Sequence, residues 1–144
     1  MTARVDELKG LALAATGRRI NEGDAVLIRT GQERYTLTDP DFYMQPGMSR
    51  AGTLHLVNQG ATILGTDAVG WDLPFAVMAL KFKETGDKQV LWDGHKAIVE
   101  KEAIIVQQMT NLGALPLAGF MVGFFPIKLA NCSAAPARVV AFVD

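Results

Sequence analysis

Two short, continuously apolar runs with a helical pattern between them constrain the fold of this chain most. Residues 25–28 read AVLI and residues 61–67 read ATILGTD, and each run has the length of a strand. Between them, SRAGTLHLVNQG offers Ser49 as a helix N-cap and Gly60 beyond the expected helix end. This order predicts a parallel crossover unit and therefore an α/β fold. We expect the run at 25–28 to be a central strand, because it lacks alternation.

Further elements are expected on both sides of this unit. Apolar residues at helical spacing from Val5 to Ala15 predict a first helix that ends at Gly17. The polar, proline-containing stretch 32–48 predicts a long loop, and residues 68–94 give no clear pattern. Later apolar runs predict strands in AIIVQQM, GFMVGFFPIKL and ARVVAFV. With 144 residues, 49% of them hydrophobic, the chain fits a single domain over 1–144.

The charge content argues against nucleic acid and anionic membranes as partners, and the cysteine content bears on the compartment. The chain has 14 basic and 15 acidic residues, a net charge of −1 and no block of either sign, which argues against nucleic acid and anionic membranes. No segment has the length of a membrane span or the apolar core of a signal peptide. Cys132 is the only cysteine, which fits a reducing compartment, and because no histidine lies near it in the sequence we expect a small buried hydrophobe rather than a nucleophile. A cytoplasmic protein is the simplest interpretation.

His95 and Gln107 are the candidate metal ligands. The chain has only two histidines, and His95 precedes a glutamine in an apolar run that would normally exclude an amide. Imidazole nitrogen and a side-chain carbonyl can both bind a metal. The plainer interpretation is a partly exposed, hydrogen-bonded histidine. A metal site needs about three or four ligands. The other histidine, His55, is better explained by helix packing than by metal binding. The spacing of His95 and Gln107 therefore does not by itself complete a metal site.

Other polar residues near the strand ends leave two interpretations open. Asp67 and Asp72 could orient a catalytic histidine, or each could cap a turn in a loop. Trp71, beside them, could line a substrate pocket or cover the core. The charged stretch RTGQERY, which contains Arg29, Glu33 and Arg34, favours a solvated loop over a substrate clamp. No serine-nucleophile or phosphate-loop motif occurs in the sequence.

Five blocks in a fixed order resemble the C-terminal half of a known family. They are EGDAVLIRTG, MQPGMS, ILGTDAVGWD, HKAIVEKEAIIVQQMTNLGALP and PIKLANCSAAPARVVAFV, and they span about residues 20–143. The chain is similar in these blocks to the cyclase family of metal-dependent hydrolases, which includes bacterial kynurenine formamidase and isatin hydrolase. The resemblance implies a swivelling β/β/α fold, dimers or larger oligomers, and hydrolysis of amide or lactam C–N bonds with zinc or manganese.

The resemblance also implies roles for the two candidate ligands. His95 aligns with a downstream active-site histidine, and Gln107 aligns with a position that is glutamate in formamidase-like members and glutamine in isatin-hydrolase-like ones. Both would then be catalytic and metal-binding residues.

One family motif is missing from the sequence. The principal metal motif of the family, H-x-G-T-H-x-D, lies in its N-terminal half and does not occur here. We therefore expect a partial domain that needs an N-terminal half to hydrolyse a small amide or lactam. The alternative is a non-catalytic remnant or interaction subunit.

Overall fold

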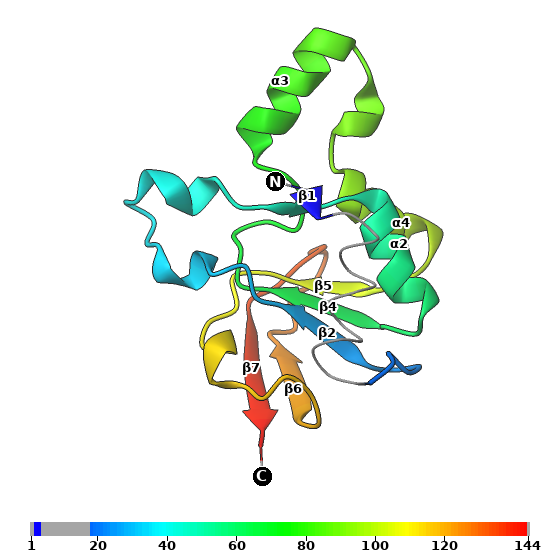
Figure 1. The fold of residues 1–144 in the computed structure, drawn as a ribbon, viewed down its shortest axis with the longest axis vertical. Coiled ribbons are helices and arrows are strands. Elements are labelled where there is room, and N and C mark those ends of the chain that lie inside the picture. The colour runs from blue at the N-terminus through cyan, green and yellow to red at the C-terminus, as the bar shows by residue number, and fades with distance from the viewer. Residues whose placement is uncertain (1, 4–17, 144) are drawn as a thin grey trace.

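The computed structural model describes residues 2–3 and 18–143 as a mixed α/β arrangement (Figure 1). The predicted helix from Val5 to Ala15 lies outside the described residues. β1 (Thr2–Ala3) pairs in parallel with β3 (Gly47–Met48). The stretch 32–48 is the expected long loop, although it contains two 3-10 turns, η1 (Gln32–Arg34) and η2 (Pro40–Tyr43), besides β3.

A parallel three-stranded sheet forms the centre of the fold. Its strands are β2 (Ala25–Ile28), β4 (Ile63–Thr66) and β5 (Ile104–Val106), in the order β2-β4-β5. Ala25 pairs with Ile63 and Ile63 with Ile104, so the predicted crossover unit is confirmed. The prediction of a central position for 25–28 is wrong, because β4 is central and β2 is an edge strand of the described sheet. All four residues of β2 are only half-buried. The apolar run at 25–28 therefore predicted neither the burial of the strand nor its number of neighbours, because both depend on which elements pack beside it.

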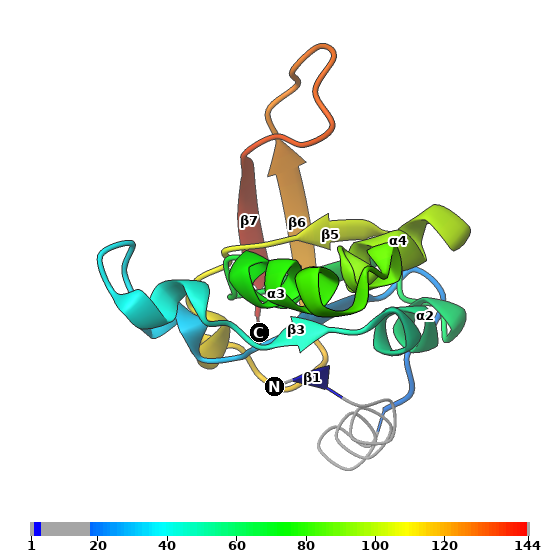
Figure 2. The same ribbon diagram turned by 90° about the horizontal axis from the view of Figure 1, so that it is seen from above.

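Two helices lie side by side against one face of this sheet, α2 (Arg50–Asn58) and α4 (Asp93–Glu100) (Figures 1 and 2). Ser49 caps α2 as predicted, since its Oγ accepts a hydrogen bond from the Gly52 N–H at 3.0 Å. Gly60 follows the end of α2 with φ of 118°, a conformation that favours glycine. The guanidinium of Arg50 donates to Glu100 across the two helices, and these hydrogen bonds raise the pKa of Arg50.

The core lies between α2 and the sheet. It contains Leu56 and Val57 of α2, Leu64 of β4, and Trp71 from the loop after β4, each at most 3% exposed. The previously unassigned stretch 68–94 contains α3 (Phe75–Thr85) and η3 (Lys88–Val90), and it leads into α4. These elements place the 67–72 loop between the sheet and the first turn of α4.

A separate hairpin completes the described chain on the other side of the sheet (Figures 1 and 2). It follows η4 (Leu112–Ala114) and consists of β6 (Met121–Pro126) and β7 (Ala137–Phe142), which pair antiparallel with each other. Cys132 lies in the connection between them and is exposed, so the expectation of a buried residue is wrong. Its apolar character did not decide its position, because the connecting loop projects away from the core (Figure 2). No helix of the described part is long and apolar enough to cross a membrane.

Candidate active site

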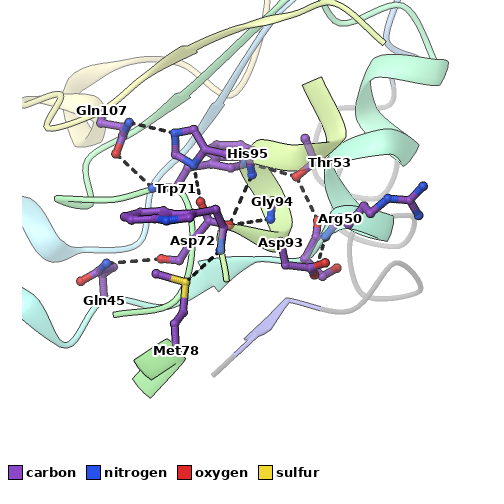
Figure 3. A network of polar contacts seen from close by, with 12 residues as sticks. Gln45, Arg50, Thr53, Trp71, Asp72, Met78, Asp93, Gly94, His95 and Gln107 are labelled. Carbon is purple, nitrogen blue, oxygen red and sulfur yellow. Dashed lines mark hydrogen bonds and ion pairs between the residues drawn. The ribbon is translucent and has the colours of Figure 1, made fainter. Parts of the chain in front are cut away.

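Polar side chains gather where the three parallel strands end. Arg29 and Thr30 follow β2, Asp67 follows β4, and Gln107 follows β5. In open sheets of parallel strands, ligands bind outside the carboxyl ends of the strands. His95 reaches the same region from the first turn of α4 (Figure 3). The topology therefore brings His95 and Gln107 together, although they come from a helix and a strand.

Asp72 holds His95 through both of its carboxylate oxygens (Figure 3). Oδ2 contacts Nδ1 of the imidazole, and Oδ1 accepts hydrogen bonds from the backbone N–H of Gly94 at 2.5 Å and of His95 at 3.3 Å. The side chain of Asp72 is only 3% exposed, whereas that of His95 is 33% exposed. One buried carboxylate thus caps α4 and orients the ring. With Nδ1–H donating to Asp72, the other ring nitrogen, Nε2, carries the free lone pair.

Gln107 occupies the other side of the imidazole. Its Oε1 accepts a hydrogen bond from the backbone N–H of Trp71 at 3.2 Å, and its Nε2 lies 3.5 Å from Nε2 of His95. Because the Trp71 N–H requires an acceptor, the amide group of Gln107 turns its donor toward the histidine. The contact is long for a hydrogen bond, so His95 Nε2 is approached by Gln107 but not tightly held.

The types of these residues suit a metal ion, but too few ligands are present among the described residues. A histidine whose Nδ1–H is bound to a buried carboxylate presents Nε2 as metal-ligating histidines do. Gln107 offers only one amide oxygen, which already accepts from Trp71. Within the described ranges, no group of three His, Cys, Asp or Glu residues could hold a metal. Because a catalytic metal needs about three protein ligands, the described residues do not complete a site.

Trp71 covers the core and also lines a cavity, while its role in a substrate pocket stays a prediction. Its ring is 1% exposed in the core, and its Nε1–H donates to Oγ1 of Thr53 at 2.9 Å. It also lines a cavity of about 200 Å³, together with Thr30, Thr66 and Gly70. A cavity of about 150 Å³ holds benzene. The loop that carries Trp71 therefore separates a space of small-molecule size from the His95–Gln107 pair.

Asp67 has a different role from Asp72. It accepts hydrogen bonds from the Thr30 N–H at 2.6 Å, the Thr30 hydroxyl at 2.8 Å and the Gly31 N–H at 2.7 Å. These are contacts of a carboxylate that caps a turn, and no contact with His95 is present among the described residues. Nearby, Arg29 pairs with Glu33 at 3.1 Å and is largely exposed, as expected for a solvated loop.

The second histidine lies elsewhere. His55 contacts Gln59 one turn further along α2, with 3.1 Å between His55 Nε2 and Gln59 Nε2. Among the described residues, His55 makes no hydrogen bond with His95 or Gln107, in keeping with the helix-surface interpretation.

Two residues of the site had no assignment from the sequence. Gln45 is buried and donates to the backbone carbonyl of Asp72 at 3.3 Å, while its Oε1 has no partner among the described residues. Trp92 precedes α4, and its ring lies 6.0 Å from that of His95. An aromatic residue three positions before the candidate histidine was an available signal for Trp92. The sequence contains no comparable signal for Gln45.

Comparison with solved structures identifies the same fold in hydrolases. An isatin hydrolase bound to the product analogue thioisatinate matches with a TM-score of 0.76 and 20% identity, over 99% of this chain and 52% of its own. Isatin hydrolase A from Labrenzia aggregata bound to benzyl benzoate matches with a TM-score of 0.71 and 22% identity, over 98% of this chain and 52% of its own. A structure described as a potential metal-dependent hydrolase with cyclase activity matches with a TM-score of 0.69 and 22% identity, over 99% of this chain and 59% of its own. The chain thus spans about half the length of these structures. No match was found among curated proteins.

The sheet topology and these matches define an α/β protein with the fold shared by isatin hydrolase, so the predicted fold class is confirmed. The chain belongs to the cyclase family, since the family model described as "Putative cyclase" matches residues 2–73, which is half of the 144 residues.

Proposed function

We propose that this chain contributes part of the active site of a metal-dependent hydrolase that cleaves amide or lactam C–N bonds in small molecules. The main support is the contact between buried Asp72 and Nδ1 of His95, which leaves His95 Nε2 directed to the ligand-binding edge of the sheet. Family membership and the hydrolase matches agree with this chemistry.

In this proposal the residues of the chain prepare the site for a divalent ion, zinc or manganese. A bound ion would lower the pKa of a water and polarise the substrate carbonyl. His95 and Gln107 would hold part of the coordination shell, and Asp72 would keep the imidazole in the tautomer with a free Nε2. The Trp71 N–H orients the Gln107 amide, so Gln107 must turn its oxygen away from Trp71 to become a ligand.

Further ligands must come from outside the described residues. Two neutral donors bind a dication much more weakly than the three-ligand sites of catalytic metals do. We propose that a segment carrying H-x-G-T-H-x-D supplies the missing ligands and that the active form is a homo-oligomer. A cytoplasmic location also stays a prediction.

A second candidate is a non-catalytic subunit with the same fold. The observation that favours it is that the Gln107 amide turns its nitrogen and not its oxygen toward His95, while a third ligand is absent from the described part. This candidate predicts that the chain binds no metal even when the H-x-G-T-H-x-D segment is supplied.

Metal titration combined with a turnover assay tests the two candidates. We expect the purified chain to bind zinc or manganese weakly and to show no hydrolysis of N-formylkynurenine or isatin. Supplying a segment with H-x-G-T-H-x-D should restore binding and turnover, and His95→Ala should abolish both, whereas the control His55→Ala should not. Metal-dependent turnover by the short chain alone would show that it is a sufficient enzyme. Absence of metal binding in the supplemented protein would favour the non-catalytic subunit.

A further inference from the structure

Trp92 has a backbone conformation that is unusual for its side chain. It precedes α4 with φ of 56° and ψ of 41°, in the left-handed region. Glycine and asparagine occupy this region at little cost, whereas a bulky residue there is a genuine outlier. Such conformations persist where the surrounding structure imposes them, and they cluster at functional sites. The presence of the largest side chain at this position therefore calls for an explanation.

The indole is not needed for the local structure. The backbone N–H of Trp92 contacts Sδ of Met78 at 3.3 Å, a contact that any residue other than proline can make. The N-terminus of α4 is capped by Asp72 and not by the side chain of Trp92. The ring is 49% exposed, so it is only half used as core material.

The indole instead lies beside the candidate active site. Its centroid lies 6.0 Å from that of His95 in an edge-to-face arrangement, with an interplanar angle of 87°. On α3, Phe75 lies 6.2 Å from the indole at an interplanar angle of 32° and is 66% exposed. Trp92 therefore lies beside the imidazole and Phe75 lies beside Trp92, and both aromatic rings are open to solvent. Aromatic rings of this kind bury a large apolar area at little cost in conformational entropy when they contact a flat ligand.

We infer that Trp92 and Phe75 form an aromatic wall that contacts the planar ring of the substrate and presents its amide group to His95. This inference rests on the proposed function for the identity of the ligand as an amide. Trp92 is a specificity-determining residue in this arrangement, because it selects amides that carry a ring over those that do not. Its left-handed backbone lies directly before Asp93, the first residue of the helix that carries His95.

Ligand titration followed by NMR tests the wall without requiring turnover. The probes are benzamide and acetamide, which share the amide group and differ in the ring. The signals to follow are the His95 ring and the two indole N–H groups, of which that of Trp71 is buried in the core. We expect benzamide to shift the signals of His95 and Trp92 at millimolar concentration, and acetamide to shift neither.

Substitutions then assign the contact. Trp92→Asn removes the ring but tolerates the left-handed backbone, and it should weaken benzamide binding by about tenfold, whereas Trp92→Phe should retain most of it. Phe75→Ala should weaken binding less. The matched control is Phe125→Asn, which removes an exposed aromatic ring from the hairpin on the other side of the sheet and should have no effect. Because Phe75 lies on a different element, its variant tests the wall even if the Trp92 variant does not fold.

Equal benzamide affinity in the wild type, Trp92→Asn and Phe75→Ala would overturn the inference, as would shifts confined to Trp71. These results are distinguishable from failure of the proposed function. If benzamide binds at Trp92 but metal and turnover are absent in the supplemented protein, the wall exists and the hydrolase proposal fails. If turnover depends on His95 but not on Trp92 or Phe75, the hydrolase proposal stands and the wall is wrong.

Discussion

The helix-covered face of the sheet and the β6–β7 hairpin contain similar apolar sequences but differ in how they are covered. On the helix face, Leu64 and Trp71 are almost completely buried, and the Asp72 carboxylate beside them has partners on both oxygens. In the hairpin no residue is buried, and Phe125 and Phe142 are both more than half exposed. A two-stranded hairpin is marginal by itself. The comparison indicates that order in the candidate site comes from packing within the chain, whereas the hairpin needs a cover that the described residues do not provide.

The two regions should differ most in how much free energy of unfolding is lost when an aromatic ring is removed. Trp71→Ala should lower the free energy of unfolding by about 3–5 kcal/mol, because it leaves a cavity in the core and removes the partner of Thr53. Phe142→Ala should cost about 1 kcal/mol or less, since half of that ring is already in water. Urea denaturation measures both values. Similar losses for the two variants would show that the hairpin is as well packed as the core.

The next prediction separates the two buried aspartates of the helix face. Asp72→Ala should cost about 3 kcal/mol, because it removes the cap of α4 and leaves the imidazole N–H without its partner. Asp67→Ala should cost a similar amount through the Thr30–Gly31 turn. Only the first should change the balance of Nδ1–H and Nε2–H tautomers of His95, which nitrogen NMR reports directly. A tautomer shift in Asp67→Ala would contradict the separate roles of the two carboxylates.

A third prediction concerns what covers the hairpin. Met121 and Phe142 are paired across the strands, and the rings of Phe125 and Phe142 both lie over Gly123, which gives one exposed apolar face. We expect this face to promote self-association at micromolar concentration. Phe125→Lys should weaken association by about tenfold. Light scattering across a dilution series measures the change, and Phe75→Lys is the control on the other side of the sheet. A monodisperse wild-type monomer would show that the face needs no partner of this kind.

The sequence predicted the crossover unit because its signals are local. Apolar runs mark β2 and β4, and Ser49 marks the start of α2, since a cap acts within one helical turn. The start of α4 carried no such signal, because its cap is Asp72, which comes from a loop distant in the sequence. The residue before the helix, Trp92, also has a left-handed backbone conformation that its side chain does not predict. The edge position of β2 depends on which strands are its neighbours, which an apolar run does not specify.

The candidate site was predictable only in part. The pairing of His95 with Gln107 followed from family resemblance and not from spacing, since a helix terminus and a strand end meet only in the folded chain. Asp67 and Asp72 could not be told apart in the sequence, because both follow the same strand and the difference lies in which backbone each one reaches. The metal and catalytic roles of these residues stay predictions.

The smallest expected effect isolates the backbone of Trp92 from its ring. Trp92→Asn and Trp92→Ala both remove the indole and its contacts with His95 and Phe75, so packing losses should be nearly equal. Asparagine tolerates a φ of 56°, whereas alanine does so less readily. Trp92→Asn should therefore be more stable than Trp92→Ala by about 0.5–1 kcal/mol, measured as a shift in the urea midpoint at constant slope. If the alanine variant were equally stable, the turn before α4 would relax when the ring is lost. The left-handed conformation would then be a consequence of the indole, and not a requirement of the helix that carries His95.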